Sequence, residues 1–77
     1  MKILLADDHR LMREGLRSLL ARQSGMDIVG EADNGITAVQ LARELTPDVV
    51  IMDIAMPDLN GIEATRQIKA ELPETKI

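Results

Sequence analysis

Short apolar runs alternate with segments of helical periodicity along these 77 residues, and this alternation restricts the fold more than any other feature of the sequence. The runs are KILLA (2–6), MDIVGEA (26–32) and DVVIMD (48–53). Each is short, mostly apolar and bounded by polar residues, which is typical of a strand buried on both faces. Such strands belong to parallel sheets that are covered by helices.

Three segments between and after these runs have the period of amphipathic helices. They extend from about His9 to Gln23, from Asn34 to the residue before Pro47, and from Asn60 to Leu72. The side chains expected to face inward are Met12, Leu16, Leu19 and Leu20 in the first helix, Ile36, Val39, Ala42 and Leu45 in the second, and Ile62, Thr65, Ile68 and Leu72 in the third.

The ends of these helices carry capping signals. Asn34 and Asn60 are expected N-caps, and Asn60 with Glu63 resembles a capping box. Gly61, which follows Asn60, either permits a close backbone approach or simply occupies the first helical turn.

The expected order of elements is β-α-β-α-β-α, and Thr75–Ile77 begins a fourth strand. This order predicts an α/β fold with a parallel sheet and right-handed crossovers, in which the first strand lies between the second and the third. The third strand would then have an unpaired apolar edge. We therefore expect residues 1–77 to be the N-terminal part of one larger domain, with no second domain in this chain.

Composition narrows the class of protein. The net charge of −4 argues against unspecific binding to nucleic acids or membranes, and no aromatic residue is present to stack on bases. Without cysteine there is neither a disulfide framework nor a thiolate metal site. No apolar stretch approaches the ~20 residues of a membrane span, and no secretory signal begins the chain, so we expect a cytoplasmic protein.

Carboxylates follow two of the predicted strands directly. Asp7 and Asp8 come after the first strand, and Asp53 ends the third. Ligands of open parallel sheets bind beyond the carboxyl ends of neighbouring strands, so these side chains are expected to meet. Two like charges ~4 Å apart repel by ~4 kcal/mol at an effective dielectric constant of 20, which favours a cation between them. With oxygen ligands, Mg²⁺ fits better than Mn²⁺ or Ca²⁺.

A carboxylate beside Mg²⁺ can attack a phosphoryl donor and form an aspartyl phosphate. Asp53 extends from a buried strand and suits the nucleophile, whereas Asp7 and Asp8 precede a helix and suit metal binding. Each residue alone could merely favour a helix start or end a strand. Three carboxylates at matched strand ends favour a functional site.

The sequence resembles the receiver domain of two-component response regulators. The resemblance rests on the Asp7-Asp8 pair and on DIAMPDLNG (53–61), which matches the family signature D-x-x-M-P-x-x-[DN]-G at every defined position. Three further stretches are similar to the subgroup whose receivers precede a helix-turn-helix DNA-binding domain: ADDHRLMREGLRSLL, VGEADNGITAV and LNGIEATRQIK. The resemblance implies a flavodoxin-like sheet in the order 2-1-3-4-5, of which strands 4 and 5 have no counterpart in this chain.

The resemblance also implies roles for individual residues. Asp53 would accept a phosphoryl group from a sensor histidine kinase, without the domain being a turnover enzyme. Mg²⁺ would be bound by Asp8, Asp53 and the backbone carbonyl of Ala55, and by Asp7 directly or through water. Phosphorylation would control a transcription regulator through a DNA-binding domain outside this chain, and the chain itself would contact neither nucleic acid nor membrane. The family's Ser or Thr after strand 4 and Lys after strand 5 have no counterpart here.

Two other functions fit the sequence. One is an interaction fragment that associates with itself through the exposed edge of the third strand and carries no phosphotransfer activity. The other is a metal-dependent phosphohydrolase, although such enzymes often carry a second acid where this chain has Ala55. We interpret His9 as an exposed residue at a helix start, and Arg10, Arg13 and Arg17 as a solvated charged face.

Overall fold

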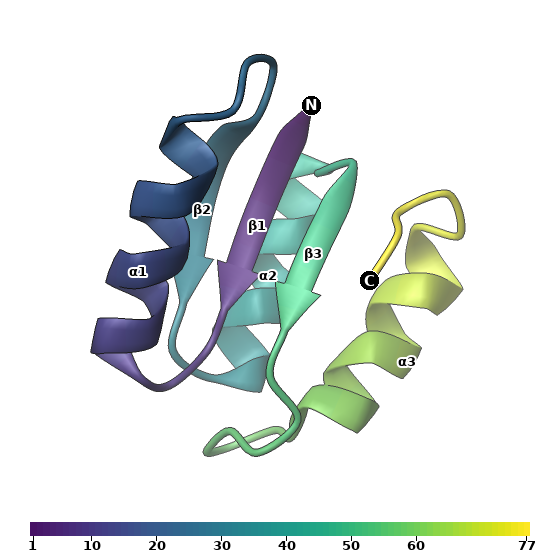
Figure 1. Cartoon of the computed structure of the whole chain (residues 1–77). Helices are drawn as coiled ribbons and strands as arrows, with labels where there is room; N and C mark the ends of the chain where they lie inside the picture. The colour runs from purple at the N-terminus through teal and green to yellow at the C-terminus, as the bar shows by residue number, and fades with distance from the viewer.

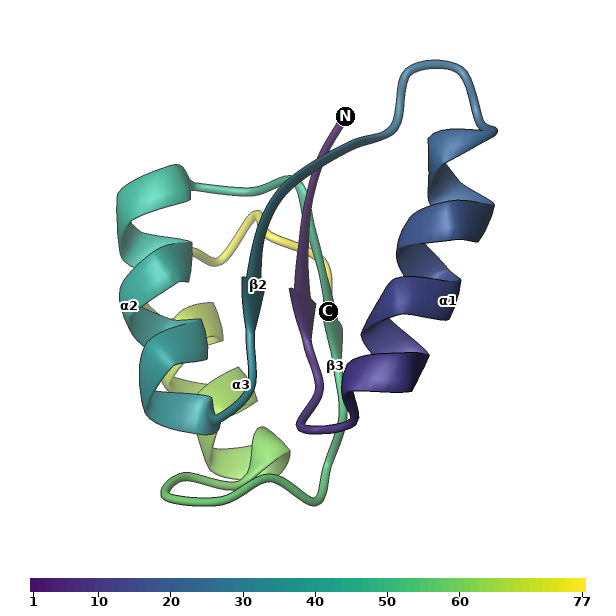
Figure 2. The same cartoon turned by 90° about the vertical axis from the view of Figure 1, so that its left-hand side faces the viewer.

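Residues 1–77 are described by a computed structural model in which a three-stranded parallel sheet lies between helices (Figure 1). The strands are β1 (Lys2–Ala6), β2 (Asp27–Ala32) and β3 (Val49–Met52), and the helices are α1 (Arg10–Ala21), α2 (Gly35–Leu45) and α3 (Gly61–Glu71). Helix α1 covers one face of the sheet, and α2 and α3 cover the other (Figure 2). The predicted α/β architecture and order of elements are confirmed.

The strand order is β2-β1-β3, as predicted, so β1 is central and pairs in parallel with both neighbours. The end of the chain lies along the outer edge of β3, where Val49 and Lys76 form a parallel bridge. In this bridge the Val50 N–H donates to the Lys76 carbonyl at 2.7 Å. The bridge is the beginning of the fourth strand expected at Thr75–Ile77, and beyond it the edge of β3 has no strand partner.

The core lies between the sheet and the helices α2 and α3. Its main cluster consists of Leu4, Val39, Ala42, Val50, Ala64 and Ile68. On the opposite face, α1 buries no residue, and its side chains Met12 and Leu19 are 55% and 62% exposed. The prediction that these two side chains are buried in a core is therefore wrong. Met12 lines a hollow with Leu5, Ile51 and Met52 of the sheet, but no second helix packs beside α1 to cover it.

The inner faces of α2 and α3 agree with the prediction at Val39, Ala42 and Ile68, which are buried, and differ from it at two positions. Ile36 and Ile62 are exposed, whereas Ala38 and Ala64 are fully buried. Alanine side chains let a helix approach the sheet closely, so both helices are turned with their alanines inward. Helical periodicity identified an apolar stripe, but the space available at the sheet decided which of its residues are buried.

The helix starts agree with the predicted caps. Asn34 and Asn60 accept hydrogen bonds from the backbone N–H groups of Thr37 at 2.8 Å and Glu63 at 2.9 Å. The carboxylate of Glu63 pairs with Arg66 and does not complete the reciprocal bond of a capping box. None of the three helices combines the length and the apolar character needed to cross a lipid bilayer.

Candidate functional site

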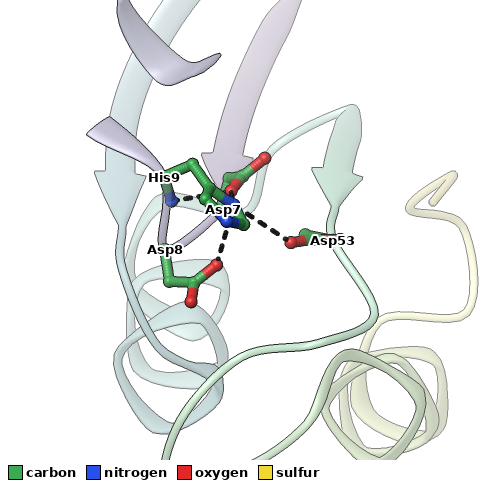
Figure 3. Close-up of side chains that lie close together, drawn as sticks. All are labelled: Asp7, Asp8, His9 and Asp53. Atoms are coloured by element: carbon green, nitrogen blue, oxygen red, sulfur yellow. Dashed lines mark hydrogen bonds and ion pairs between the residues drawn. The ribbon is translucent and has the colours of Figure 1, made fainter. Parts of the chain in front are cut away.

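The register of the sheet brings together carboxylates from two strands. Ala6 of β1 lies opposite Met52 of β3, so Asp7 and Asp53 are the next residues of two neighbouring parallel strands. The ladder continues into them, because the Asp53 N–H donates to the Ala6 carbonyl at 2.8 Å. One carboxylate oxygen from each of Asp7, Asp8 and Asp53 lies within 4.8 Å of the others (Figure 3). The three side chains that the sequence singled out therefore form one cluster.

His9 joins this cluster from the loop before α1. Its Nδ1 lies 2.9 Å from Asp7, 3.1 Å from Asp8 and 3.8 Å from Asp53 (Figure 3). The hydrogen bond with Asp7 and the charge of Asp8 raise the pKa of His9 above its ordinary value of 6.5. The side chain is 70% exposed, as expected, but it is also the only basic group within ion-pair distance of the three carboxylates. The sequence interpretation missed this second role.

Two neighbouring elements hold the backbone of Asp7. Its N–H donates to the Ala32 carbonyl at the end of β2 at 3.0 Å. Its carbonyl accepts a hydrogen bond at 2.5 Å from Nη1 of Arg13 in α1, and Nε of Arg13 donates to Glu31 of β2 at 3.3 Å. Since the Arg13 side chain is only 17% exposed, its interpretation as part of a solvated charged face is wrong.

Packing of the backbone holds Asp53. Gly61, at the start of α3, lies so close that a Cβ atom there would be 1.9 Å from the Asp53 carbonyl oxygen. The Gly61 N–H donates to the Ile54 carbonyl at 2.7 Å, and the Ile54 N–H donates to Oδ1 of Asp53 at 2.8 Å. Gly61 is the first residue of α3 and also makes a close backbone approach, so the structure shows both of the roles considered for it.

The loop between β3 and α3 also rests on α2. A Cβ atom at Gly35 would lie 1.8 Å from the Leu59 carbonyl oxygen, so the first turn of α2 touches the loop backbone directly. Met56 is buried among alanines of β1, β2 and α2. These contacts fix the loop on both sides of Ala55, whose carbonyl accepts no hydrogen bond from the chain. That carbonyl is available to a further ligand.

The lysines of the chain lie away from this cluster. The ammonium group of Lys2 donates to the carbonyl of Leu45, the last residue of α2, at 2.7 Å, and that of Lys69 donates to the Thr75 carbonyl, beyond the end of α3, at 2.8 Å. Lys76 is at the opposite end of β3 from Asp53. Within this chain, His9 is therefore the basic side chain within ion-pair distance of the carboxylates, and the guanidinium of Arg13 lies behind them at the Asp7 carbonyl.

The chemistry of the cluster suits a hard divalent cation. The three carboxylates offer oxygen atoms, the ligand type that Mg²⁺ prefers, and the ring nitrogen of His9 is the one further ligand atom within the same 4.8 Å. Asp8 is exposed, and Asp7 and Asp53 are half-buried, so water can complete an octahedral shell. Neighbouring carboxylates at this separation repel one another, and a divalent cation removes that cost. The residues present thus fit Mg²⁺.

Comparison with known proteins gives one consistent result. The response regulator receiver domain family matches residues 3–77. Response regulator protein VraR of Staphylococcus saprophyticus is 46% identical over 76 residues, which are 99% of this chain and 36% of that protein.

Solved structures of response regulators have the same fold. The response regulator domain of Thermotoga maritima CheB matches with a TM-score of 0.92 and 45% identity, over 95% of this chain and 55% of that one. A LuxR-family two-component response regulator from Aurantimonas sp. SI85-9A1 matches with a TM-score of 0.85 and 47% identity, over 91% of this chain and 50% of that one. The chain thus spans about a third of the curated relative and about half of each solved chain.

Proposed function

This chain belongs to the response regulator receiver domain family of two-component systems, and from this premise we propose that Asp53 accepts a phosphoryl group with the assistance of Mg²⁺. The observation that carries the proposal is the convergence of three carboxylates from two neighbouring strand ends. Receiver domains are signalling domains, so the product of the reaction is the modified chain itself. This distinguishes the proposal from a phosphohydrolase, which would release phosphate at every turnover.

In the proposed reaction a carboxylate oxygen of Asp53 attacks the phosphorus of the donor. A P–O bond to Asp53 forms while the bond from phosphorus to the donor atom breaks, and the electron pair leaves with the donor. Oδ1 of Asp53 already accepts the Ile54 N–H at 2.8 Å, whereas Oδ2 is directed toward His9 and the other carboxylates. Oδ2 is therefore the oxygen better placed to attack, and the packed backbone of Asp53 limits the reorganisation required.

Asp7, Asp8, Asp53 and the carbonyl of Ala55 would hold the metal ion. When bound, Mg²⁺ supplies positive charge that offsets the carboxylates and the phosphoryl oxygens. His9 would have to give up its contacts with the carboxylate oxygens, which its exposed side chain can do by turning toward solvent. The assignment of a Mg²⁺ site is supported by these ligands taken together rather than by any single residue.

We place the phosphoryl donor in the class of sensor histidine kinases, because the family acts in two-component systems. The likeness to RcsB of Salmonella enterica, which is 30% identical and was solved bound to a promoter, supports a role in controlling an attached DNA-binding domain in a longer protein. Residues 1–77 would take no direct part in DNA binding, since their net charge is −4.

The test is the intact mass of the 77-residue chain after incubation with Mg²⁺ and a small-molecule phosphodonor such as acetyl phosphate. We expect one added phosphoryl group, which disappears when the metal is chelated. The matched control is Asp53→Asn, which keeps the size and the hydrogen-bonding capacity of the side chain but removes the nucleophilic carboxylate. No adduct on the unsubstituted chain, or an equal adduct on the control, would contradict the proposal.

A second candidate function is self-association of this chain, and the exposed apolar side chains of α1 and the free edge of β3 favour it. Leu11, Met12 and Leu19 of α1 are exposed, and β3 has a strand partner only at the bridge to Lys76. Apolar side chains and a free strand edge together favour pairing with a second copy. Light scattering over a range of concentrations tests this, because a constant monomer mass up to millimolar concentration would exclude it.

A further inference from the structure

We propose that Arg13 is a positioning residue of the acidic cluster. Its guanidinium connects the peptide between Asp7 and Asp8 to Glu31 of β2, and thereby holds both carboxylates in the orientation that binds a divalent cation. This inference rests on the proposed Mg²⁺ site, but it concerns a residue outside the set of ligands. Arg13 would act through Asp7 and touch neither the metal nor the phosphoryl group.

Arg13 joins the end of β1 to β2 with two separate donors. Nη1 donates to the Asp7 carbonyl at 2.5 Å, and Nε donates to a Glu31 oxygen at 3.3 Å. The side chains of Arg13 and Glu31 are 17% and 23% exposed, so water competes for these contacts less than it does at a surface ion pair. A guanidinium holds its donors in a fixed planar arrangement and can serve both acceptors at once, whereas an ammonium group cannot do so with the same geometry.

The end of β1 needs such a contact. Strand β1 ends at Ala6 and α1 begins at Arg10, so the Asp7 carbonyl lies between two regular elements. Arg13 is the hydrogen-bond donor to this carbonyl, and the sheet supplies none. The same carbonyl belongs to the peptide group that joins Asp7 to Asp8, and rotation of this group would redirect both carboxylates. One hydrogen bond therefore restrains two of the proposed ligands.

Arg17 supplies an internal comparison. It lies one turn further along α1, also forms an ion pair with Glu31, and is 59% exposed. It makes no hydrogen bond to Asp7. Arg13 and Arg17 thus share the helix, the charge and the partner in β2, and they differ in the contact with the Asp7 carbonyl.

The two explanations for a role of Arg13, positioning and simple electrostatics, predict opposite changes in Mg²⁺ affinity when Arg13 is substituted. Removing a cation near three carboxylates makes the local potential more negative, so electrostatics alone predicts tighter binding of Mg²⁺. Loss of the restraint on Asp7 predicts weaker binding. Substitution of residues that support metal ligands typically costs 10–100-fold in affinity.

The experiment is a titration with Mg²⁺ at constant ionic strength, in which NMR chemical shifts of the backbone amides report binding. The samples are the 77-residue chain and its variants Arg13→Gln, Arg13→Lys and Arg17→Gln. Circular dichroism of each variant verifies folding at the titration temperature. We expect Arg13→Gln to bind Mg²⁺ about tenfold more weakly, and Arg17→Gln to bind it as tightly as the unsubstituted chain or slightly more tightly. Arg13→Lys keeps the charge and should recover only part of the loss.

Three results would overturn the inference. The first is equal or tighter binding by Arg13→Gln, and the second is an equal loss in Arg17→Gln, which would trace the effect to the pair with Glu31. If Arg13→Gln does not fold, the test rests on Arg13→Lys. The third result that would overturn the inference is a Mg²⁺ affinity of Arg13→Lys equal to that of the unsubstituted chain. Absence of saturable binding by the unsubstituted chain is a separate outcome, because it would remove the proposed metal site and the inference with it.

Discussion

Asp7 and Asp53 lie side by side at the ends of neighbouring strands, but the chain is fixed differently on the two sides. On the β1 side, the sheet holds the Asp7 N–H, but a side chain holds its carbonyl, through Arg13 and its pair with Glu31. The helix that follows, α1, buries none of its residues. On the β3 side, backbone packs directly on backbone at Gly61, and the following helix α3 buries three residues.

This difference predicts how each side responds to substitution. A hydrogen bond from a side chain contributes ~1 kcal/mol and can be weakened by degrees. Contact between backbone atoms at a glycine leaves no room, so any added atom forces the chain to move. The proposed nucleophile, Asp53, is on the rigid side, and the two carboxylates proposed only as metal ligands, Asp7 and Asp8, are on the adjustable side. Such an arrangement keeps the attacking oxygen fixed while the metal ligands adapt.

The largest expected effect is that of Gly61→Ala on the β3 side. The new Cβ would lie 1.9 Å from the Asp53 carbonyl oxygen, so either α3 or the strand end must shift. We expect a loss of about 3 kcal/mol in the free energy of unfolding, measured by urea titration and circular dichroism. Acceptance of the phosphoryl group should fall with it, because the displaced residue is the proposed nucleophile.

The matched substitution on the β1 side is Gly15→Ala. Gly15 lies within α1, and a Cβ atom there would meet no atom within 4 Å. Since glycine is unfavourable inside a helix, this variant should be more stable than the unsubstituted chain by about 0.5–1 kcal/mol. If Gly61→Ala and Gly15→Ala had similar stability, the β3 side would not be more tightly packed than the β1 side, and the distinction between them would be wrong.

A smaller effect is expected for Asn60→Ala. This substitution removes the acceptor of the Glu63 N–H at the start of α3 and should cost about 1 kcal/mol of stability. It should also weaken Mg²⁺ binding a few-fold, because the cap fixes the helix turn that contacts Asp53. Asn34→Ala removes the corresponding cap of α2, whose first turn contacts the loop at Leu59 and not Asp53, and serves as the comparison, with a similar loss of stability but a smaller loss of Mg²⁺ affinity. Equal Mg²⁺ affinity in both variants would show that the α3 cap stabilises the fold without restraining Asp53.

The carboxylates on both sides could be predicted from sequence, because they directly follow apolar runs whose pairing is set by the order of elements. Their contacts could not. Arg13 has a local signal, since it shares a helical face with Leu16 and Leu20, which are half-buried. Its partner Glu31 belongs to another strand, however, and their contact depends on how α1 lies across the sheet. That orientation is not encoded in a helical period.

The glycines illustrate the same limit. Gly61 and Gly35 both begin helices, which is an ordinary place for a glycine, and their close contacts are with residues of a loop and a strand end. The error at Ile36 and Ile62 has a related cause, because the depth to which a helix settles on the sheet decided that alanines face inward. Local pattern thus predicts elements and their order, whereas contacts at distances below 4 Å depend on the assembled structure.

The smallest expected effect is that of His9→Gln, on the β1 side. The imidazole contacts all three carboxylates but is 70% exposed, and it occupies oxygen atoms that a divalent cation would also use. Water can replace such a side chain. We therefore expect Mg²⁺ affinity to stay the same or to rise by about twofold, because the imidazole no longer competes with the cation for the carboxylate oxygens. Arg10→Gln, a substitution of an exposed residue one position further along the chain, is the control. A tenfold loss of affinity in His9→Gln alone would mean that His9 holds the carboxylates in place, and the β1 side would then depend on two basic side chains rather than on Arg13.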